Sequence, residues 1–394
     1  MYVIIYMIGD KIMSKRRIFN KIDKPLLVLT ILCLVFGVMM VGSASSLKAY
    51  ISKGNSYYYF FRQLFFILVG LGGSFFVILT PLKKYKKLIY VALIGVIGAL
   101  IYVLLSEKVM NGIKGWLFIA GFGIQPSEFA KTVLILFFAL YFESILKHNN
   151  VNNVIKVIPF IVAAAILFLI LQQPDLGTMV ILLGITGVIF LIVPYDKKTK
   201  LVFSSFALIS VIIIAITMTV TGKGLSEAQK NRFNYKEPCT RYRHETGYQV
   251  CNGYIAINSG GLLGSGFGNS KQKYLYLPEA HTDFIFAIII EEMGLLVGIV
   301  IVLFYFIMIW RILMIGRKSY NIQGLIICYG VATYIALHVL INLGGVLGLI
   351  PFTGVPLPFY SYGGSFMINL LICLGLVQRV SVENKFFEQK HLVR

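Results

Sequence analysis

The sequence carries few charged residues: Asp, Glu, Lys and Arg make up 13% of its 394 positions, where a soluble domain has about 25%. With 58% hydrophobic residues and a mean hydropathy of +0.83, this deficit excludes an ordinary soluble domain. The period-two alternation of a membrane β-barrel is also missing. Apolar blocks of roughly 18 to 22 residues recur instead, long enough to cross a bilayer as helices. We therefore predict an all-α polytopic membrane protein.

Cysteine and histidine are scarce, with five of each, and neither shows a metal-site spacing. Cys33, Cys328 and Cys373 fall in apolar runs and read as small core residues. Cys239 and Cys251 share one long loop, where a disulfide forms if that loop is extracytoplasmic. The sequence gives no geometry for this pair, so the disulfide stays open at this stage.

Nucleic-acid-binding motifs, internal repeats and a separate soluble domain are missing too, so we expect no nucleic acid partner despite a net charge of +20. About 22 Lys and Arg residues lie on the side that holds the N-terminus, against about six in the short connections of the other side. This bias predicts that both termini are cytoplasmic and that a long loop, 222–281, faces outward.

The apolar blocks predict about ten transmembrane helices. We expect a cytoplasmic segment at 1–24, a membrane domain at 25–380 and a cytoplasmic tail at 381–394. The N-terminus does not resemble a cleaved signal peptide, because its apolar stretch is short and its basic cluster comes afterwards; we expect translation to start at Met13 rather than Met1. The expected spans are 25–46, 59–80, 88–105, 126–146, 156–172, 177–194, 201–221, 282–309, 323–345 and 364–380.

The outer connections differ from the short, basic inner loops, because polar motifs gather in them. Ionisable groups at membrane depth are costly and usually face a cavity or a partner, so these motifs predict a hydrated cavity at the outer face. The motifs are Asn111–Trp116, Gln125–Lys131, Gln173–Thr178 and Pro351–Ser365.

The segment Leu277-Pro-Glu-Ala-His-Thr-Asp-Phe-Ile-Phe286 is the sharpest of the outer motifs. If it is helical, Glu279 and Asp283 are i,i+4 neighbours, and two adjacent carboxylates leave one of them ready to act as an acid or base. The alternatives are that Thr282 or Asp283 caps the eighth span, or that the segment contacts a partner. Glu291 and Glu292 are expected deeper, serving neighbouring spans rather than a substrate.

Three other features allow a functional and a structural interpretation. Glu128 and Lys131 either neutralise each other or offer the lysine charge to an anion. The glycine-rich run Gly260–Lys273 lacks a nucleotide-loop ending; it is either a plain mobile loop or one that brings Lys271 and Lys273 to an anionic headgroup. Ser361, Ser365 and His338 lack the Gly-x-Ser-x-Gly elbow of a hydrolase.

Four strings of the sequence are long and uncommon: GWLFIAGFGIQPSEFAK, QPDLGT, GYQVCNGYIAINSGGLLGSGFGNSKQKYLYLPEAHTDFIFAIIIEEMG and PFTGVPLPFYSYGGS. Taken together, they resemble the SEDS family of FtsW, RodA and SpoVE. The resemblance runs from the first span to the tenth. It implies a ten-span inverting glycosyltransferase of the bacterial cytoplasmic membrane, which polymerises lipid II into β-1,4 glycan at the outer face and releases undecaprenyl pyrophosphate.

The resemblance places the essential acid of the family on Asp283. One general base suffices for a single inverting displacement, because the pyrophosphate leaves as an anion. Lys114, Lys131 and Arg232 match basic positions and become candidates for pyrophosphate contacts. A divalent cation, Mg²⁺ or Mn²⁺, is expected as an optional cofactor near Asp283 or Glu279. The remaining substrate-binding candidates are Gln125, Ser127, Glu128, Glu279, His281 and Ser361.

Departures from the family pattern refine the expectation. Gly115 replaces a second basic residue before Trp116, so pyrophosphate binding there is expected to be weaker or differently shared. Phe366 replaces a serine, which is expected to alter packing rather than chemistry. The run before Tyr274 is closer to the FtsW branch than to RodA, which favours septal synthesis in cell division over elongation. The implied partners are lipid II, the nascent glycan strand, a class B penicillin-binding transpeptidase and other divisome proteins. The competing functions are a lipid II flippase and a non-catalytic scaffold.

Overall fold

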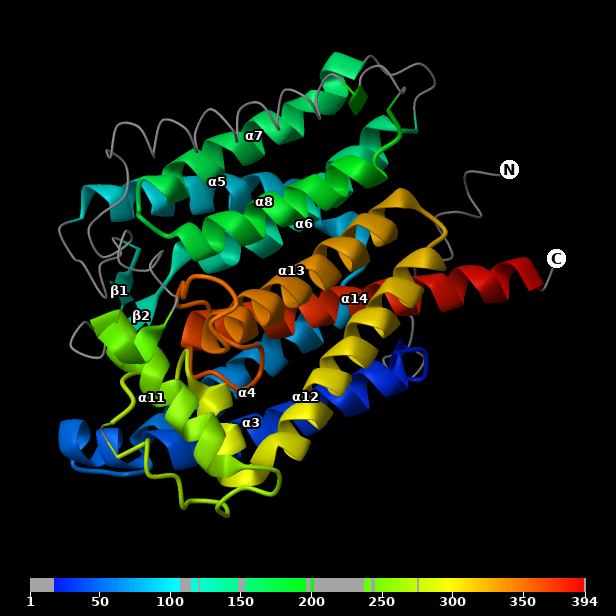
Figure 1. Ribbon diagram of the computed structural model, residues 1–394. Helices are drawn as coiled ribbons and strands as arrows, with labels where there is room; N and C mark the ends of the chain where they lie inside the picture. The colour runs from blue at the N-terminus through cyan, green and yellow to red at the C-terminus, as the bar shows by residue number, and fades with distance from the viewer. Residues whose placement is uncertain are drawn as a thin grey trace, which may run out of the picture.

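Long apolar helices make up most of the protein, as the expected spans require (Figure 1). The computed structural model describes residues 18–106, 115–119, 121–147, 153–195, 200–201, 237–241, 245–274 and 276–392. Within these ranges the long helices are α3 (Lys24–Lys53), α4 (Tyr58–Leu79), α5 (Tyr85–Leu105), α6 (Pro126–Ile145), α7 (Asn153–Leu171), α8 (Leu176–Ile192), α12 (Ile285–Arg317), α13 (Ile322–Val346) and α14 (Gly364–Leu392).

Shorter elements join these helices. A hairpin of β1 (Leu117–Ile119) and β2 (Phe122–Ile124) pairs antiparallel before α6. The 3₁₀ turns are η1 (Leu82–Lys84) and η2 (Pro238–Arg241), and α11 (Glu245–Gly260) precedes the turns that lead to α12.

Side chains at the helix starts explain several of these boundaries. Asp23 accepts a hydrogen bond from the backbone N–H of Leu26 at 3.1 Å and begins α3. Asp175 accepts one from Thr178 at 3.0 Å and begins α8. Each cap pairs a backbone donor that the first turn of a helix otherwise leaves unsatisfied. Pro126 occupies the first turn of α6, where its missing N–H costs nothing.

Nine of the ten expected spans coincide with described helices, and the expected span 201–221 lies almost wholly outside the described residues. Among the described residues, seven helices are long and apolar enough to cross a membrane. The 17-residue α8 is apolar but short, and α6 carries Glu128, Lys131 and Glu143. The helical membrane fold is therefore confirmed, while the full count of ten spans stays a prediction.

Helices α13 and α14 form the interior of the bundle. In the most apolar 18-residue window of each helix, 67% of the residues of α13 and 89% of those of α14 are buried. The corresponding share is 22% for α4, α5 and α7, whose outer faces are left for lipid. Small residues let α14 approach α4 closely: a side chain at Gly70 would stand 2.7 Å from Leu371. Close backbone approach at small residues is the usual way that helices associate in lipid.

The two ends of the described chain lie together at one end of the bundle, which we call the terminus end (Figure 1). There the side chain of Gln378 accepts from the backbone N–H of Asp23 at 2.7 Å and donates to its carbonyl at 3.0 Å. Lys385 donates to the carbonyl of Ile22 at 3.0 Å. Helices α6, α8, α12 and α14 all begin at the opposite end, which we call the site end. That the terminus end is cytoplasmic stays a prediction.

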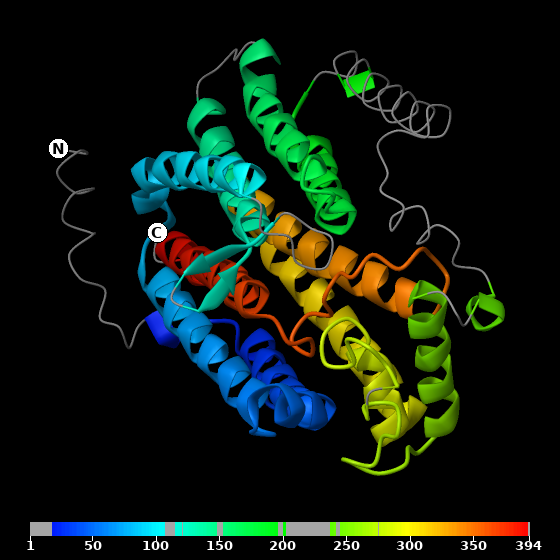
Figure 2. The same cartoon turned by 90° about the vertical axis from the view of Figure 1, so that its left-hand side faces the viewer.

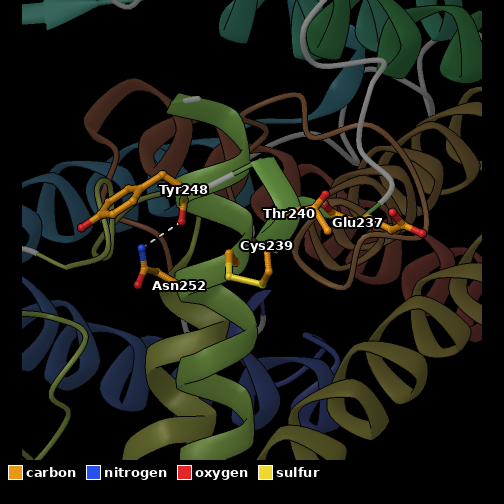
Figure 3. Close-up of a disulfide and its surroundings, with 6 residues drawn as sticks. Glu237, Cys239, Thr240, Tyr248 and Asn252 are labelled. Carbon is orange, nitrogen blue, oxygen red and sulfur yellow. Dashed lines mark hydrogen bonds between the residues drawn. A yellow bond between two sulfur atoms is a disulfide. The ribbon is translucent and has the colours of Figure 1, made fainter. Parts of the chain in front are cut away.

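The expected outer loop 222–281 contains a helix that the sequence did not indicate. Residues 245–260 of this loop form α11, which packs along α12 (Figure 2). A disulfide between Cys239 and Cys251 joins η2 to this helix (Figure 3), so the open question about this pair is answered in favour of the bond. Cys33, Cys328 and Cys373 are buried and free, as expected.

The Gly260–Lys273 run is not a plain mobile loop. It crosses α12 where Gly294 adopts φ 86° and ψ 166°, which breaks the helix into two. The run replaces the broken helical bonds: Ser265 N–H donates to the Glu291 carbonyl at 2.9 Å, and Leu295 N–H donates to the Gly261 carbonyl at 2.9 Å. The expected span at 282–309 is therefore present as α12, but it is kinked at a glycine that the apolar run does not reveal.

The two acids at this kink hold the run in place. The Glu291 carboxylate accepts from the Ser270 hydroxyl at 2.5 Å and from the backbone N–H of Lys271 at 2.9 Å. Glu292 pairs with the Lys273 ammonium at 2.8 Å, and both side chains are almost fully buried. The interpretation that Lys273 meets an anionic headgroup is therefore wrong, because that lysine is already neutralised. The expectation that Glu291 and Glu292 serve the protein rather than a substrate agrees with these contacts.

Candidate active site

Four of the sequence motifs meet at the site end. Gln125 stands at the start of α6, and its side chain donates to the Asp175 carboxylate at the start of α8 at 3.1 Å. The backbone N–H of Gln125 donates to the Ser365 hydroxyl at the start of α14 at 3.1 Å. The turn 277–284 leads into α12 beside the segment 351–365. Residues far apart in the chain therefore converge on one site, and the hydrated cavity that the outer motifs predict there stays a prediction.

Asp283 lies on a turn and not on a helix. Helix α12 begins at Ile285 with Phe284 in the N-cap position, so neither Thr282 nor Asp283 is the cap residue. Asp283 is partly exposed, with Phe284 behind it fully buried. The carbonyl of Asp283 accepts from the side chain of Asn342 on α13 at 2.8 Å. The backbone of this carboxylate is thus held by a neighbouring helix while the side chain stays within reach of solvent.

Glu279 is not the helical neighbour of Asp283 that the spacing allowed, because its φ of 55° is incompatible with an α-helix. Its carboxylate accepts from the Lys48 ammonium at 3.1 Å and from the Thr282 hydroxyl at 2.8 Å. Burial raises the pKa of Glu279, but Lys48 and Thr282 outweigh burial and hold that pKa below its usual value. Glu279 is therefore an ionised tether between α3 and the turn.

These contacts bear on the expected divalent cation. Each oxygen of the Glu279 carboxylate already has a partner on this chain, and the described residues contain no group of three His, Cys, Asp or Glu side chains that could hold a metal ion. Glu279 therefore does not fit as a metal ligand in this arrangement. Mg²⁺ often takes only one or two carboxylates together with substrate phosphates, so Asp283 alone is left as a candidate ligand.

His281 is buried in an aromatic setting. Its ring lies 5.0 Å from the ring of Tyr59 and 5.7 Å from that of Tyr362, and its carbonyl accepts from the backbone N–H of Tyr362 at 2.9 Å. Burial, and then the positive charge of Lys48, lower the pKa of His281 to about 4. At neutral pH the imidazole is uncharged and packs the turn against the 351–365 segment.

Several side chains tie the segment 351–365 to its surroundings. The hydroxyl of Ser361 accepts from the Leu357 N–H at 2.7 Å and donates to the Thr282 carbonyl at 2.6 Å. Asn342 donates to the Val355 carbonyl at 2.8 Å, while Tyr305 donates to that of Pro358. Ser361 is fully buried, and its hydroxyl is occupied by these two backbone groups. It joins two loops and forms no Ser–His pair with His338, consistent with the lack of a hydrolase elbow.

Glycine is required at position 354 of this segment. Its φ is +74°, and a Cβ there would stand 3.2 Å from the Oδ2 atom of Asp283. The missing side chain therefore lets the backbone approach the carboxylate.

Lys131 is fully buried inside the bundle beneath the site. Its ammonium donates to Glu128 at 2.8 Å and lies 3.1 Å from Nε2 of His338. Nδ1 of His338 is 3.1 Å from the Pro356 carbonyl, so Nδ1 carries the proton and Nε2 accepts from Lys131. The ion pair agrees with the interpretation that the two charges neutralise each other, and the interpretation that Lys131 offers its charge to an anion stays a prediction. Oε2 of Glu128 and the buried Ser127 hydroxyl have no partner among the described residues.

Two predicted contacts, Lys114 and Arg232, lie outside the described residues. Three residues at the site were missed from the sequence: Asn342, Lys48 and Gly354. Asn342 stands one helical turn from His338 on α13, and a polar pair at i,i+4 in an apolar span was an available signal. Phe366 stacks on the His338 ring at 4.7 Å, which agrees with the expectation that its replacement of serine changes packing.

The family model described as "Cell cycle protein", that of FtsW, RodA and SpoVE, matches residues 24–386. The chain belongs to this family. It is 36% identical over 388 residues to the probable peptidoglycan glycosyltransferase FtsW of Bacillus subtilis, covering 95% of this chain and 94% of that one. Stage V sporulation protein E of the same organism is 32% identical, covering 92% and 98%.

Solved structures agree with this membership in the FtsW/RodA/SpoVE family. RodA of Thermus thermophilus superposes with a TM-score of 0.64 at 25% identity, covering 91% of this chain and 96% of that one. A chain from a peptidoglycan synthase complex, solved to show how polymerization and crosslinking are coordinated, gives a TM-score of 0.72 at 24% identity, covering 92% and 98%; this likeness shows the fold alone. The resemblance to the SEDS family is thus confirmed, with relatives named FtsW as the branch prediction anticipated.

Proposed function

We propose that this chain is a peptidoglycan glycosyltransferase that polymerises lipid II and that Asp283 is its general base. The observation that carries the proposal is the position of Asp283. It is a partly exposed carboxylate at the point where four polar motifs converge, held through its backbone by Asn342. The family relatives named peptidoglycan glycosyltransferase support the activity.

In the proposed reaction the acceptor sugar hydroxyl gives its proton to the Asp283 carboxylate as its oxygen attacks the anomeric carbon of the donor. The bond from that carbon to the pyrophosphate oxygen breaks, and the electron pair leaves with undecaprenyl pyrophosphate. A β-1,4 bond forms with inversion, so one base is enough. The departing anion needs cations, for which Lys131, Lys114 and Arg232 are the candidates.

The geometry adds one condition to this assignment. Lys131 is fully enclosed and its ammonium already contacts Glu128 and His338. A direct contact between Lys131 and pyrophosphate therefore requires that the segment 351–365 or the turn 277–284 moves when substrate binds. Gln125, His281 and Ser361 then act by holding these two loops rather than by touching the sugar, and Glu128 acts by holding Lys131.

We further propose that the site faces outward and that the enzyme works at the septum, with lipid II and the growing glycan strand as substrates and a class B transpeptidase and other divisome proteins as partners. The names of the FtsW relatives favour division over a RodA-type role. Depletion of the protein should then give filamentous cells, whereas rounded cells would indicate elongation.

The deciding experiment compares purified wild-type protein, Asp283→Asn and Glu143→Gln on lipid II, with and without a class B transpeptidase. Glu143 is a matched control, because it is a carboxylate at the other end of α6 with a surface partner, Lys147, at 2.9 Å. We expect polymer from wild type and the control, and none from Asp283→Asn despite normal folding. Polymer from Asp283→Asn would remove Asp283 as the base. Translocation of lipid II in liposomes without polymer would establish a flippase instead.

A further inference from the structure

A cavity of about 130 Å³ opens at the terminus end, at the other end of the bundle from Asp283. One buried water needs only about 10–15 Å³ measured in the same way, so this space is large enough for a polyatomic group. The cavity lies where the last turns of α12 and α14 face each other next to the start of α3. It is lined by Asp23, Arg311, Met314, Ile315, Lys318, Ser381, Asn384, Lys385 and Glu388.

The lining comes from one continuous face of each helix. On α12 it is contributed by positions 311, 314, 315 and 318, and on α14 by positions 381, 384, 385 and 388. Both sets follow the i, i+3, i+4, i+7 spacing that places side chains on one side of a helix. The α14 face is polar and charged, while the α12 face places Arg311 and Lys318 on either side of Met314 and Ile315, and the two faces leave a space between them.

The charges on this lining are not balanced by one another. Arg311 forms a double hydrogen bond to Asp23, which neutralises both groups. Among the described residues, the Lys318 ammonium has no hydrogen-bond or ion-pair partner, and Lys385 donates only to the Ile22 carbonyl at 3.0 Å. Two ammonium groups thus border the cavity with Glu388 as the only further acid in its lining. A phosphate group would supply the missing negative charge.

The same cavity also presents hydrogen-bond acceptors. Asn384 is buried, and its Oδ1 atom has no partner among the described residues, while its amide donates to the Ile315 carbonyl at 3.1 Å. The Glu388 carboxylate is a second acceptor in the lining. An unsatisfied buried carbonyl is destabilising, so a ligand that donates a hydrogen bond here is favoured. The cavity therefore suits a group that carries both a phosphate and a hydrogen-bond donor.

The position of the cavity along α12 matches the headgroup level of a membrane. Trp310 is 57% exposed immediately before Arg311, and Tyr320 is 40% exposed just after the helix. Exposed aromatic side chains of this kind mark the membrane–water interface. The cavity is thus placed where lipid phosphates lie, whichever side of the membrane this end faces.

We propose that this cavity binds the headgroup of a membrane phospholipid that carries a phosphodiester and a hydrogen-bond donor, as phosphatidylglycerol and phosphatidylethanolamine do. Lys318 and Lys385 bind the phosphate oxygens. The Asn384 carbonyl and the Glu388 carboxylate accept from the hydroxyl or ammonium of the headgroup. Basic pockets between transmembrane helices are known to bind lipid headgroups in this way. The bound lipid joins the ends of α3, α12 and α14.

The test uses the full-length protein, purified in detergent and stripped of lipid. Native mass spectrometry measures how phosphatidylglycerol, phosphatidylethanolamine and phosphatidylcholine bind to wild type, to Lys318→Gln/Lys385→Gln and to Arg317→Gln/Lys390→Gln. The second double variant is the matched control, because it removes the same charge from the same two helices outside the cavity. We expect the first double variant to weaken phosphatidylglycerol binding roughly tenfold and the control to change it less than about twofold.

Two further arms identify the headgroup chemistry. Phosphatidylcholine has the phosphate but no donor, so it should bind more weakly than the other two lipids. Glu388→Gln should weaken phosphatidylethanolamine, whose ammonium it meets, more than phosphatidylglycerol. Equal loss in both double variants, or equal binding of all three lipids, would overturn the proposal. Displacement of the lipid by inorganic phosphate at equal concentration would assign the site to a soluble anion.

Discussion

The side chain of Asn342 donates to the carbonyl of Asp283 at 2.8 Å and to the carbonyl of Val355 at 2.8 Å. One residue on α13 thus joins the turn before α12 to the segment before α14. Its Oδ1 atom is buried and has no partner among the described residues. The position of the proposed base therefore depends on a residue that does not itself carry out chemistry.

Replacing Asn342 with leucine should lower the polymerisation rate while leaving lipid II binding nearly intact. Leucine has a similar volume but cannot donate, so two buried carbonyls lose a partner. We expect the free energy of unfolding to fall by about 2–4 kcal/mol and kcat to fall by more than KM changes. Steady-state kinetics and thermal unfolding at the same pH measure both effects.

Tyr305→Phe is the matched control for this variant. Tyr305 also donates to a carbonyl of the same segment, that of Pro358, but no described contact links it to Asp283. It should lose stability without a comparable loss of kcat. If the two variants lose kcat equally, the segment as a whole matters and Asn342 has no special role in placing Asp283.

Gly354→Ala should inactivate the enzyme more than it destabilises the fold. The backbone of residue 354 has a φ of +74°, and a methyl group there would stand 3.2 Å from the Asp283 carboxylate. The left-handed conformation costs alanine about 1–2 kcal/mol, and the contact pushes the carboxylate out of place. Gly54→Ala is the matched control, because Gly54 has nearly the same φ, +70°, and a Cβ added there would have no atom within 4 Å. Equal activity in the two variants would show that the approach to Asp283 is unimportant.

Two variants separate a structural role of the Glu128–Lys131 pair from a role in substrate binding. Lys131→Met leaves a buried carboxylate unpaired, which should cost about 3–5 kcal/mol of stability. The double variant Lys131→Met/Glu128→Gln removes both charges and should recover most of that stability. If Lys131 meets pyrophosphate, the double variant stays inactive in the lipid II assay even though it is stable. Recovered activity would leave the pair a purely structural role.

Hydropathy and charge bias predicted nine helices that the structure describes, because membrane crossing imposes length and composition on each span separately. The same reasoning could not find the kink at Gly294, since a glycine inside an apolar run does not interrupt hydropathy. The adjacent acids Glu291 and Glu292 were the available signal, because paired carboxylates in a continuous span would be costly. They bind the Gly260–Lys273 run instead.

At the site, sequence motifs identified Asp283 and Glu279 but not their partners. The contacts of Lys48 with Glu279 and of Asn342 with Asp283 join positions 231 and 59 residues apart. Contacts at such separation leave no periodic pattern in one sequence. The helical spacing assumed for Glu279 and Asp283 was overridden by this tertiary tether, which holds Glu279 at positive φ.

Acid should destabilise the site end by protonating His281. The usual pKa of histidine is 6.5, and burial followed by the Lys48 charge lowers that of His281 to about 4. The unfolded chain therefore binds more protons than the folded chain between these values, so stability falls as pH decreases from 6.5 to 4. Each pH unit in this window lowers the free energy of unfolding by about 1.4 kcal/mol, so about 2 kcal/mol of stability is lost between pH 6.5 and 5. Glu279, whose pKa lies below its usual value, stays ionised across that window.

His281→Gln removes the titrating ring while keeping a polar side chain between Tyr59 and Tyr362. The variant should be less stable than wild type at pH 7.5, because the aromatic contacts are lost. Its unfolding free energy should nevertheless decline less between pH 6.5 and 5, because no buried imidazole remains to be protonated. Chemical unfolding in detergent at several pH values measures the two slopes. Parallel slopes in wild type and variant would mean that another group, and not His281, carries the acid sensitivity of the turn that holds Asp283.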